Sequence, residues 1–226
     1  MEEVVGRLLI IQKNNPSTNK IPSQILKKIM NVFLVFLLDG TYHQAWLEDM
    51  AVRLVCVLAL DRFGDFVSDQ VVAPVRETCA QALGGILHLL SEGGVFGVLS
   101  LLETMLSWKE WEARHGGLLG LKYLLAVRDD LRSQLLTHAY PHIYKGLVDE
   151  MDDVVAVAAS CLVPVSDSVV LLLDREVVTK LVATLWDSLL DIDDLTSSTN
   201  SILLLLSKLL SHLSSDARCV KRCKET

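Results

Sequence analysis

A repeat of about forty residues is the feature of this sequence that most restricts its fold. With Arg76 as position zero, the same short pattern returns at Arg114, Val155 and Thr196, at intervals of 38, 41 and 41 residues. Position +3 is small or short and position +7 is leucine: Cys79, Gly117, Ala158 and Thr199 stand at +3, and Leu83, Leu121, Leu162 and Leu203 stand at +7. Positions +3, +4 and +7 lie on one face of an α-helix, so each copy predicts a helix that packs closely against a neighbour.

The repeat length is typical of HEAT and armadillo units, although the first interval is slightly short. Each predicted inner helix has an outer partner: 49–66 pairs with the helix that contains Arg76, 95–106 with 111–127, 131–148 with 154–165, and 177–190 with 195–213. A single pair cannot bury its apolar face, but stacked pairs share one continuous core. We therefore predict an all-α fold, a HEAT-repeat α-solenoid (α-α superhelix) of about four helix pairs.

The helix breakers and the composition suggest a three-part organisation. The pair Gly93-Gly94 and the stretch Ser166-Asp167-Ser168 are predicted breaks between units, and Pro141 is expected to bend the 131–148 helix. Residues 1–40 are expected to be an atypical N-terminal segment with one helix, and residues 41–213 the HEAT array. Residues 214–226 are a basic tail that we expect to be disordered.

The overall charge disfavours a direct grip on nucleic acid. The formal net charge is −7, and no basic stripe precedes the last few residues, whereas binding to DNA phosphates needs clustered lysine and arginine. A basic partner protein is the better expectation. The longest uncharged apolar runs fall well short of the ~20 residues that a membrane-spanning helix needs, so we predict buried helices and no membrane contact.

The five cysteines, an odd number without a secretory signal, indicate a reducing compartment. Cys56, Cys79 and Cys161 stand in apolar helical runs and are predicted to behave as small hydrophobic residues. Cys219 and Cys223, even with His212, fall short of the four closely spaced ligands of structural zinc. We predict no bound metal.

No motif in the sequence supplies a complete catalytic or cofactor site. The glycines between residues 93 and 97 lack the Gly-Lys-Ser/Thr ending of a phosphate-binding loop. His115-Gly116-Gly117 has no Gly-x-Ser-x-Gly motif to complete an esterase site. The aspartates at 191–194 lack the glycine and the final glutamate of a calcium loop. We therefore predict no catalytic residue, no cofactor, no small-molecule substrate and no enzyme activity in this chain.

Acidic residues gather at the turns that lead from outer to inner helices, and in a HEAT stack these turns emerge on one edge. Helix capping and the helix macrodipole explain part of this acidity. The remainder predicts an acidic ridge suited to a basic protein surface. Trp111 is either an apolar anchor of that ridge or a packed turn residue. The predicted partner-binding residues are Glu110, Trp111, Glu112, Asp149, Glu150, Asp152, Asp153, Asp191, Asp193 and Asp194.

Several longer strings resemble the N-terminal HEAT region of the TATA-binding-protein-associated factor 172 family. They are residues 59–69 with 73–78, residues 111–120, and residues 185–187 with 193–201. The resemblance implies a large nuclear protein whose HEAT array holds the TATA-binding protein through helix-connecting loops. It also implies a C-terminal Swi/Snf-type ATPase that removes this partner from promoter DNA.

The sequence also departs from the family. It has no Walker A sequence, no Asp-Glu-x-His box and no helicase motif, and Val155 stands where the repeat expects arginine. We expect a nuclear TATA-binding-protein scaffold, a fragment or truncated form of the longer protein, that meets DNA only through its partner or the full-length protein. The alternatives are a generic HEAT scaffold, of transport-receptor or phosphatase-subunit type, and an inactive fragment of the remodelling ATPase.

Overall fold

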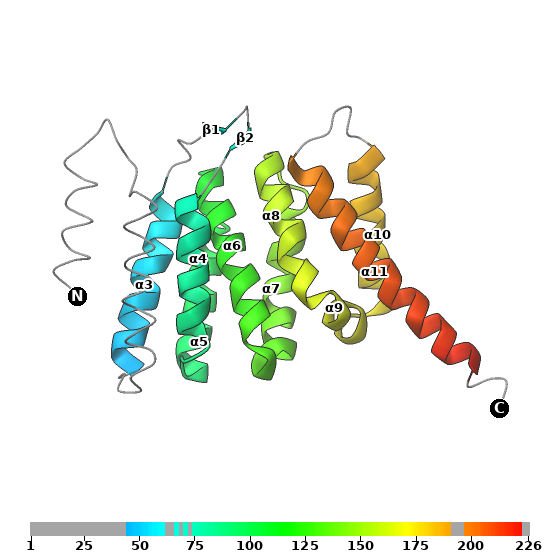
Figure 1. Cartoon of the computed structure of the whole chain (residues 1–226), viewed down its shortest axis with the longest axis horizontal. Helices are drawn as coiled ribbons and strands as arrows, with labels where there is room; N and C mark the ends of the chain where they lie inside the picture. The colour runs from blue at the N-terminus through cyan, green and yellow to red at the C-terminus, as the bar shows by residue number, and fades with distance from the viewer. Residues whose placement is uncertain (1–43, 62–65, 68–69, 72–73, 191–196, 223–226) are drawn as a thin grey trace.

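The structure is a computed structural model that describes residues 44–61, 66–67, 70–71, 74–190 and 197–222 (Figure 1). The helices are α3 (Gln44–Leu60), α4 (Pro74–Leu87), α5 (Glu92–Met105), α6 (Trp111–Val127), η1 (Asp129–Leu131), α7 (Arg132–Gly146), α8 (Asp152–Leu162), η2 (Val163–Val165), α9 (Ser166–Leu172), α10 (Arg175–Leu190) and α11 (Ser197–Arg222). Two short strands, β1 (Phe66–Val67) and β2 (Gln70–Val71), pair antiparallel. The prediction of an all-α solenoid of about four helix pairs is confirmed.

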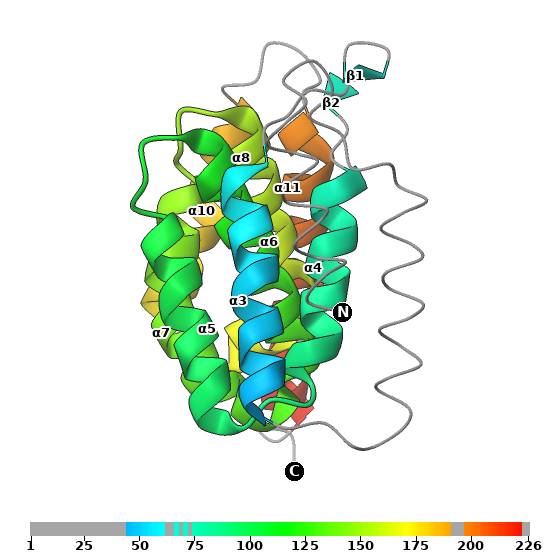
Figure 2. The same cartoon turned by 90° about the vertical axis from the view of Figure 1, so that its left-hand side faces the viewer.

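The helices stack in two layers (Figures 1 and 2). One layer contains α4, α6, α8 and α11, each packed against the next, and the other contains α3, α5, α7 and α10. The pairs are α3 with α4, α5 with α6, α7 with α8, and α10 with α11. The inner helices at the predicted Arg76, Arg114, Val155 and Thr196 copies therefore line up side by side, as the repeat requires.

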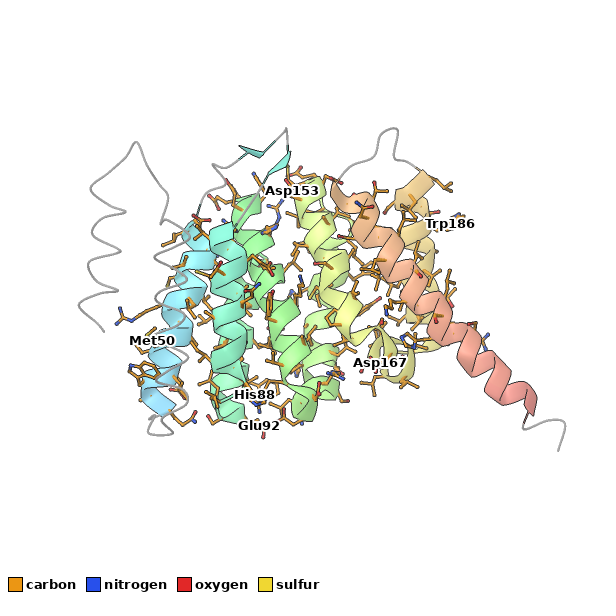
Figure 3. All side chains as sticks on the ribbon, in the orientation of Figure 1. Met50, His88, Glu92, Asp153, Asp167 and Trp186 are labelled. Atoms are coloured by element: carbon orange, nitrogen blue, oxygen red, sulfur yellow. The ribbon has the colours of Figure 1, made fainter. Side chains whose placement is uncertain are left out.

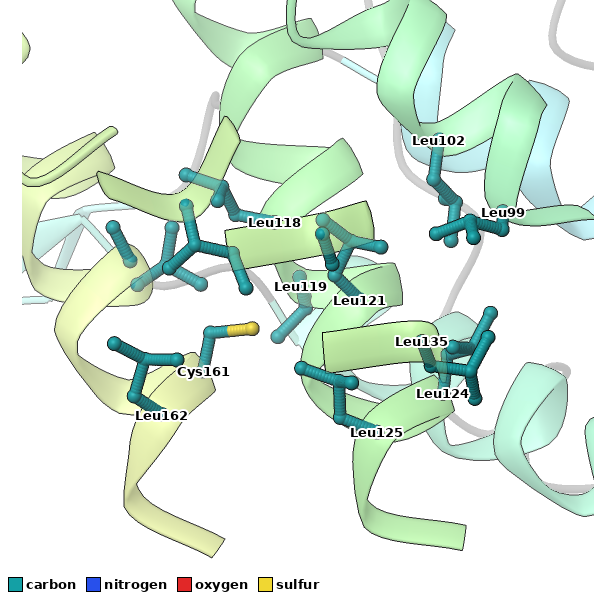
Figure 4. Close-up of a cluster of buried hydrophobic side chains, with 14 of the residues drawn as sticks. Leu99, Leu102, Leu118, Leu119, Leu121, Leu124, Leu125, Leu135, Cys161 and Leu162 are labelled. Atoms are coloured by element: carbon teal, nitrogen blue, oxygen red, sulfur yellow. The ribbon is translucent and has the colours of Figure 1, made fainter. Parts of the chain in front are cut away.

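The shared positions of the repeat form the core between these layers. The +7 residues Leu83, Leu121 and Leu162 have no solvent exposure, and the +3 residues Cys79 and Ala158 are also buried. Figure 4 shows Leu121 of α6 and Leu162 of α8 among the buried leucines that fill the space between successive pairs. Burial of this apolar surface is the main source of stability for a stack whose units cannot fold singly.

The fourth copy of the repeat is correct in period, but its predicted face is only partly buried. Thr199 at +3 is buried, whereas Asn200 at +4 is exposed and Leu203 at +7 is 50% exposed. In the first three inner helices, the residues at +4 and +7 are buried. Within the described residues no helix follows α11, so this side of α11 faces solvent.

Gly116 and Gly117 let α6 approach its neighbours more closely than any side chain would allow. A Cβ atom at Gly116 would lie 2.2 Å from the carbonyl oxygen of Leu58 in α3. A Cβ atom at Gly117 would lie 2.8 Å from Cδ2 of Leu106. The small residue predicted at +3 therefore serves the close packing that the sequence indicated, and the preceding glycine sets the crossing with α3.

Two predicted breaks lie inside helices. Gly93 and Gly94 belong to the first turn of α5, because Ser91 caps that helix by accepting a hydrogen bond from the amide of Gly94 at 3.3 Å. The stretch Ser166–Ser168 opens α9, and the chain changes direction at Pro164 in η2 before it. Ser166 and Ser168 are buried, so these small side chains pack inside the array instead of lying in an exposed turn.

The structure also differs from the prediction at the C-terminal end of the array. Helix α11 continues to Arg222, so most of the segment expected to be a disordered basic tail has a helical backbone. Residues 197–222 contain neither proline nor glycine, so no residue there interrupts the helix. The atypical segment predicted at residues 1–40 lies outside the described residues.

One helical stretch, Asp152–Leu172, is long and apolar enough to cross a membrane by length and composition. It comprises three elements, α8, η2 and α9, with a bend at Pro164, and 56% of its most apolar window is buried inside the array. These are the properties of a core helix. Of the three cysteines predicted to be small core residues, Cys79 and Cys161 are buried, but Cys56 is exposed on α3.

The contact at Gly116 leads to a prediction of stability. Replacing Gly116 with alanine should lower the free energy of unfolding by about 3 kcal/mol or more, because the new Cβ meets backbone that cannot move aside. Gly97→Ala is the matched control, since Gly97 lies within α5 and a Cβ there meets nothing within 4 Å. This control should be neutral or stabilising by up to ~1 kcal/mol. Urea unfolding followed by circular dichroism measures both, and equal stabilities of the two variants would contradict the packing argument.

Candidate protein-interaction edge

The turns from outer to inner helices emerge together on one edge of the array, at the top of Figure 1. This turn edge consists of residues 106–112 and 147–153, with the ends of α3 and α10 and the starts of α4 and α11. The β1–β2 hairpin lies on the same edge. The predicted common edge is therefore present among the described turns.

Arg76, at position zero of the first inner helix, is completely buried at this edge. Its guanidinium donates hydrogen bonds to the carbonyl oxygens of Asp61, after α3, and of Glu112, in the first turn of α6. Its Nε also lies 3.3 Å from a carboxylate oxygen of Asp61. One side chain therefore joins α4 to its own outer helix and to the next pair.

Arg114 occupies the same position in the second inner helix and makes the same kind of connection. Its Nη1 donates to the carbonyl oxygens of Trp108, at 3.3 Å, and Lys109, at 2.7 Å. Its Nε donates to one carboxylate oxygen of Asp149 and its Nη2 donates to the other, each at 2.7 Å. Because this bidentate pair is mostly shielded from solvent, it fixes the α5–α6 turn beside the α7–α8 turn.

The third junction uses a different contact, because Val155 replaces the arginine. Asp152, in the first turn of α8, accepts a hydrogen bond from the backbone amide of Ser198 at 3.3 Å. This carboxylate satisfies one of the free amides at the start of α11. An acidic residue therefore makes a link here that the arginine makes in the other two pairs.

The opposite edge is secured in the same way at the α4–α5 turn. Arg128, after α6, donates to the carbonyl oxygens of Leu87 and Leu90 and forms a bidentate pair with Asp130. Gln44 donates to the carbonyl oxygen of Leu89 and accepts from the amide of Ser91. The carbonyl contacts of Arg128 are buried, whereas Gln44 and Asp130 are exposed, and together they hold the α4–α5 turn against its neighbours.

The acidic residues predicted to bind a partner differ in how available they are. Asp149 is held by Arg114 and also accepts from the amide of Met151, so its carboxylate is engaged inside the edge. Glu112, Asp152 and Asp153 are half-buried in the first turns of their helices. Glu110 is exposed, and the side chain of Glu150 is 85% exposed. Asp191, Asp193 and Asp194 lie outside the described residues.

Two tryptophans belong to the α5–α6 turn and its junction with α6. Trp111 is partly buried and packs against the hydrophobic core. Trp108, which the sequence reasoning did not select, is 41% exposed. The sequence places both near the same turn, and only their packing distinguishes them. Trp108 is therefore the more accessible aromatic group on the turn edge.

Behind the turn edge lies a group of buried titratable residues. Burial raises the pKa of the Cys79 thiol to about 12, and the nearby Asp61 carboxylate adds to this effect. Burial lowers the pKa of His115 to about 3, and the positive charges of Arg76 and Lys122 lower it further. A neutral imidazole that is half-buried and a protonated thiol that is fully buried are suited to packing rather than to nucleophilic chemistry.

The described residues contain no group of three or more histidine, cysteine, aspartate or glutamate side chains that could hold a metal ion. Cys219 and Cys223, considered above for zinc, have no described side chains. The turn edge therefore offers exposed carboxylates and apolar side chains on a rigid support, which is the chemistry of a protein-binding surface.

The Arg114–Asp149 pair should contribute strongly to stability. Arg114→Ala removes a charge that holds two turns and leaves Asp149 shielded without its cation, so we expect a loss of about 3 kcal/mol. Arg53→Ala is the control: Arg53 pairs with Asp49 at the same 2.7 Å distance, but on an exposed helix face. The control should lose no more than about 0.5 kcal/mol. Chemical unfolding measures both losses, and similar losses would contradict the role assigned to Arg114.

Stability should fall on acidification because of His115. The folded chain keeps this imidazole neutral, while the unfolded chain takes up a proton below its usual pKa of 6.5, so lowering the pH favours unfolding. From pH 7 to pH 5 this effect should remove about 2 kcal/mol of the free energy of unfolding. His115→Asn should remove that difference, whereas the same change at exposed His88 should retain it. Urea titrations at the two pH values test this, and an unchanged pH difference in His115→Asn would refute it.

Comparison with curated proteins finds close relatives of most of the chain. It is 57% identical to the human (Homo sapiens) TATA-binding protein-associated factor 172 over 170 residues, which are 75% of this chain and 9% of the relative. It is 48% identical to the Arabidopsis thaliana TATA-binding protein-associated factor BTAF1 over 166 residues, and 43% identical to Saccharomyces cerevisiae MOT1 over 178 residues. The chain spans only 8–10% of the length of these relatives. No family model matches the chain.

Among solved structures, the chain is similar to a crystal structure of the Mot1 N-terminal domain in complex with TBP. The TM-score is 0.55 at 23% sequence identity, and the match covers 71% of this chain and 19% of that chain. At this identity the match supports the fold alone, namely the stacked helical array described above.

Proposed function

Because this chain belongs to the TATA-binding protein-associated factor 172 family over three quarters of its length, we propose that it is a protein-binding HEAT scaffold for the TATA-binding protein. The observation that carries the proposal is the 57% identity to a relative named for that association. The solved neighbour, a domain in complex with TBP, agrees with it. In this proposal the chain works in the nucleus and meets DNA only through its partner or the longer protein.

The turn edge is the surface that we propose for the contact. Its exposed carboxylates, Glu110 and Glu150, extend from two turns that Arg114 joins through the Lys109 carbonyl and the Asp149 carboxylate, and a carboxylate oxygen of Glu150 lies 3.9 Å from Nη2 of Arg114. A net charge of −7 favours the approach of a basic partner, and fixed turns reduce the conformational entropy lost on binding. Of the ten predicted partner-binding residues, Glu110 and Glu150 are the ones we assign to direct charge contacts. Asp149 and Asp152 instead support the edge from within.

We propose no catalytic activity for this chain. The ATP-dependent removal of the TATA-binding protein from promoter DNA, which the family resemblance implies, depends on a motor whose sequence motifs do not occur in these 226 residues. The chain would therefore bind the partner without removing it. Hydrolysis of ATP by the purified chain would contradict this part of the proposal.

Binding of recombinant TATA-binding protein, measured by biolayer interferometry at low salt, tests the proposal. We expect micromolar or tighter affinity that weakens as salt is added. Reversing both exposed charges, Glu110→Lys with Glu150→Lys, should weaken binding about tenfold, equivalent to about 1.4 kcal/mol. The two support carboxylates are left intact, because their reversal would disturb the fold and obscure the result.

Glu92→Lys with Asp167→Lys is the matched control, since it makes the same change in net charge on the opposite edge (Figure 3). This control should keep the affinity of the unaltered chain within about twofold. Absence of binding by the unaltered, helical chain would exclude this partner and favour a generic HEAT scaffold. Equal losses in the two double variants would leave the partner in place but remove the turn edge as its site.

A further inference from the structure

Arg114 connects two neighbouring turns, and each of these turns carries an exposed apolar side chain. Its guanidinium binds the carbonyl oxygen of Trp108 in one turn and the carboxylate of Asp149 in the next. Trp108 is 41% exposed, and Val148, adjacent to Asp149, is 59% exposed. Because one guanidinium binds the backbone of the first turn and the Asp149 side chain of the second, it ties together the two turns that carry Trp108 and Val148.

Exposed apolar side chains also occur at the two ends of the same edge. Leu60, the last residue of α3, is 63% exposed, and Leu190, the last residue of α10, is 70% exposed. Each of the outer helices α3, α5, α7 and α10 therefore has a large exposed apolar side chain at its last residue or in the turn that follows it. Keeping such side chains exposed has a cost in free energy, which burial against a partner would recover.

The charged groups around Trp108 and Val148 define what could cover them. Glu110 and Glu150 are exposed beside them, and Lys109 contributes one positive charge in the same turn. An apolar centre with a charged margin is the usual composition of a protein–protein interface, and tryptophan is enriched among the residues that contribute most to binding. The margin is acidic on balance, so it fits a partner whose apolar patch is bordered by lysine or arginine.

We infer that Trp108 and Val148 form the apolar centre of the partner-binding surface, with Trp108 as the dominant contact. This inference rests on the proposed function, and the partner is the same basic protein, the TATA-binding protein. Trp111 supports the turn through its packing on the core and does not contact the partner. Arg114 and Asp149 are positioning residues, since they hold the two turns in register.

The test compares single tryptophan replacements in the full chain by biolayer interferometry with recombinant TATA-binding protein. Trp108→Ala should weaken binding about 30-fold, and Val148→Ala about threefold to fivefold. Trp186→Ala is the matched control: Trp186 is 56% exposed on α10, away from the turns that Arg114 joins (Figure 3). This control should bind within about twofold of the unaltered chain.

Further measurements separate the effect of each replacement on binding from its effect on folding, and determine the oligomeric state. Thermal unfolding should show that Trp108→Ala remains folded at the temperature of the binding assay, and Trp108→Phe should recover part of the lost affinity. Trp111→Ala should lower the midpoint of thermal unfolding but, where still folded, keep the affinity within about threefold. Analytical ultracentrifugation of the unaltered chain should give a monomer.

Each outcome bears on the inference. If the unaltered chain binds and Trp108→Ala binds equally well, the inference is wrong while the proposed function stands. If the unaltered chain does not bind, both fail. If the unaltered chain is a dimer that Trp108→Ala dissociates, the patch joins two copies of this chain, and the assignment to the TATA-binding protein is wrong.

Discussion

The structure depends on arginine side chains that bind backbone carbonyl oxygens at the ends of helices. Carbonyl oxygens in the turns between helices have no partner within a helix, so donors from side chains can satisfy them. Arg76 binds carbonyls from two successive pairs, whereas Arg114 binds two carbonyls of the α5–α6 turn and reaches the next pair through the carboxylate of Asp149. A guanidinium has five donors in a fixed plane, so one residue can connect three segments. Lysine, with its single ammonium group, could not form the same bidentate connection.

This arrangement divides the acidity of the turn edge into two kinds. Asp149 and Asp152 face inward, where they complete the contacts of Arg114 and of the first turn of α11. Glu110 and Glu150 remain in solvent and carry the negative charge that an approaching protein meets. The formal charge of the chain therefore overstates the acidity available for recognition. The internal carboxylates contribute to binding only by holding the exposed groups in place.

The period of the sequence predicted the layers, but it could not predict which residues of the edge are free. Leucine at +7 and a small residue at +3 follow from helix geometry alone, and Leu121 and Gly117 occupy the predicted places. Leu203 obeys the same period, yet its exposure depends on whether another helix follows α11. Asp149 and Glu150 are adjacent and chemically alike, yet Arg114, 35 residues before Asp149, lies 2.7 Å from the shielded Asp149 carboxylate and 3.9 Å from that of Glu150, which is 85% exposed. The same is true of Trp108 and Trp111, whose difference is one of packing.

Gly116 is a position of the array that tolerates almost no substitution. The backbone of α3 occupies the space where any side chain would begin, so every substitution must separate two helices of the core. Gly93 and Gly97 in α5 have open space instead and can accept larger residues without a clash. Homologous sequences that keep this fold should therefore vary at Gly93 and Gly97 on the surface of α5. They should retain glycine at position 116, where α3 and α6 cross.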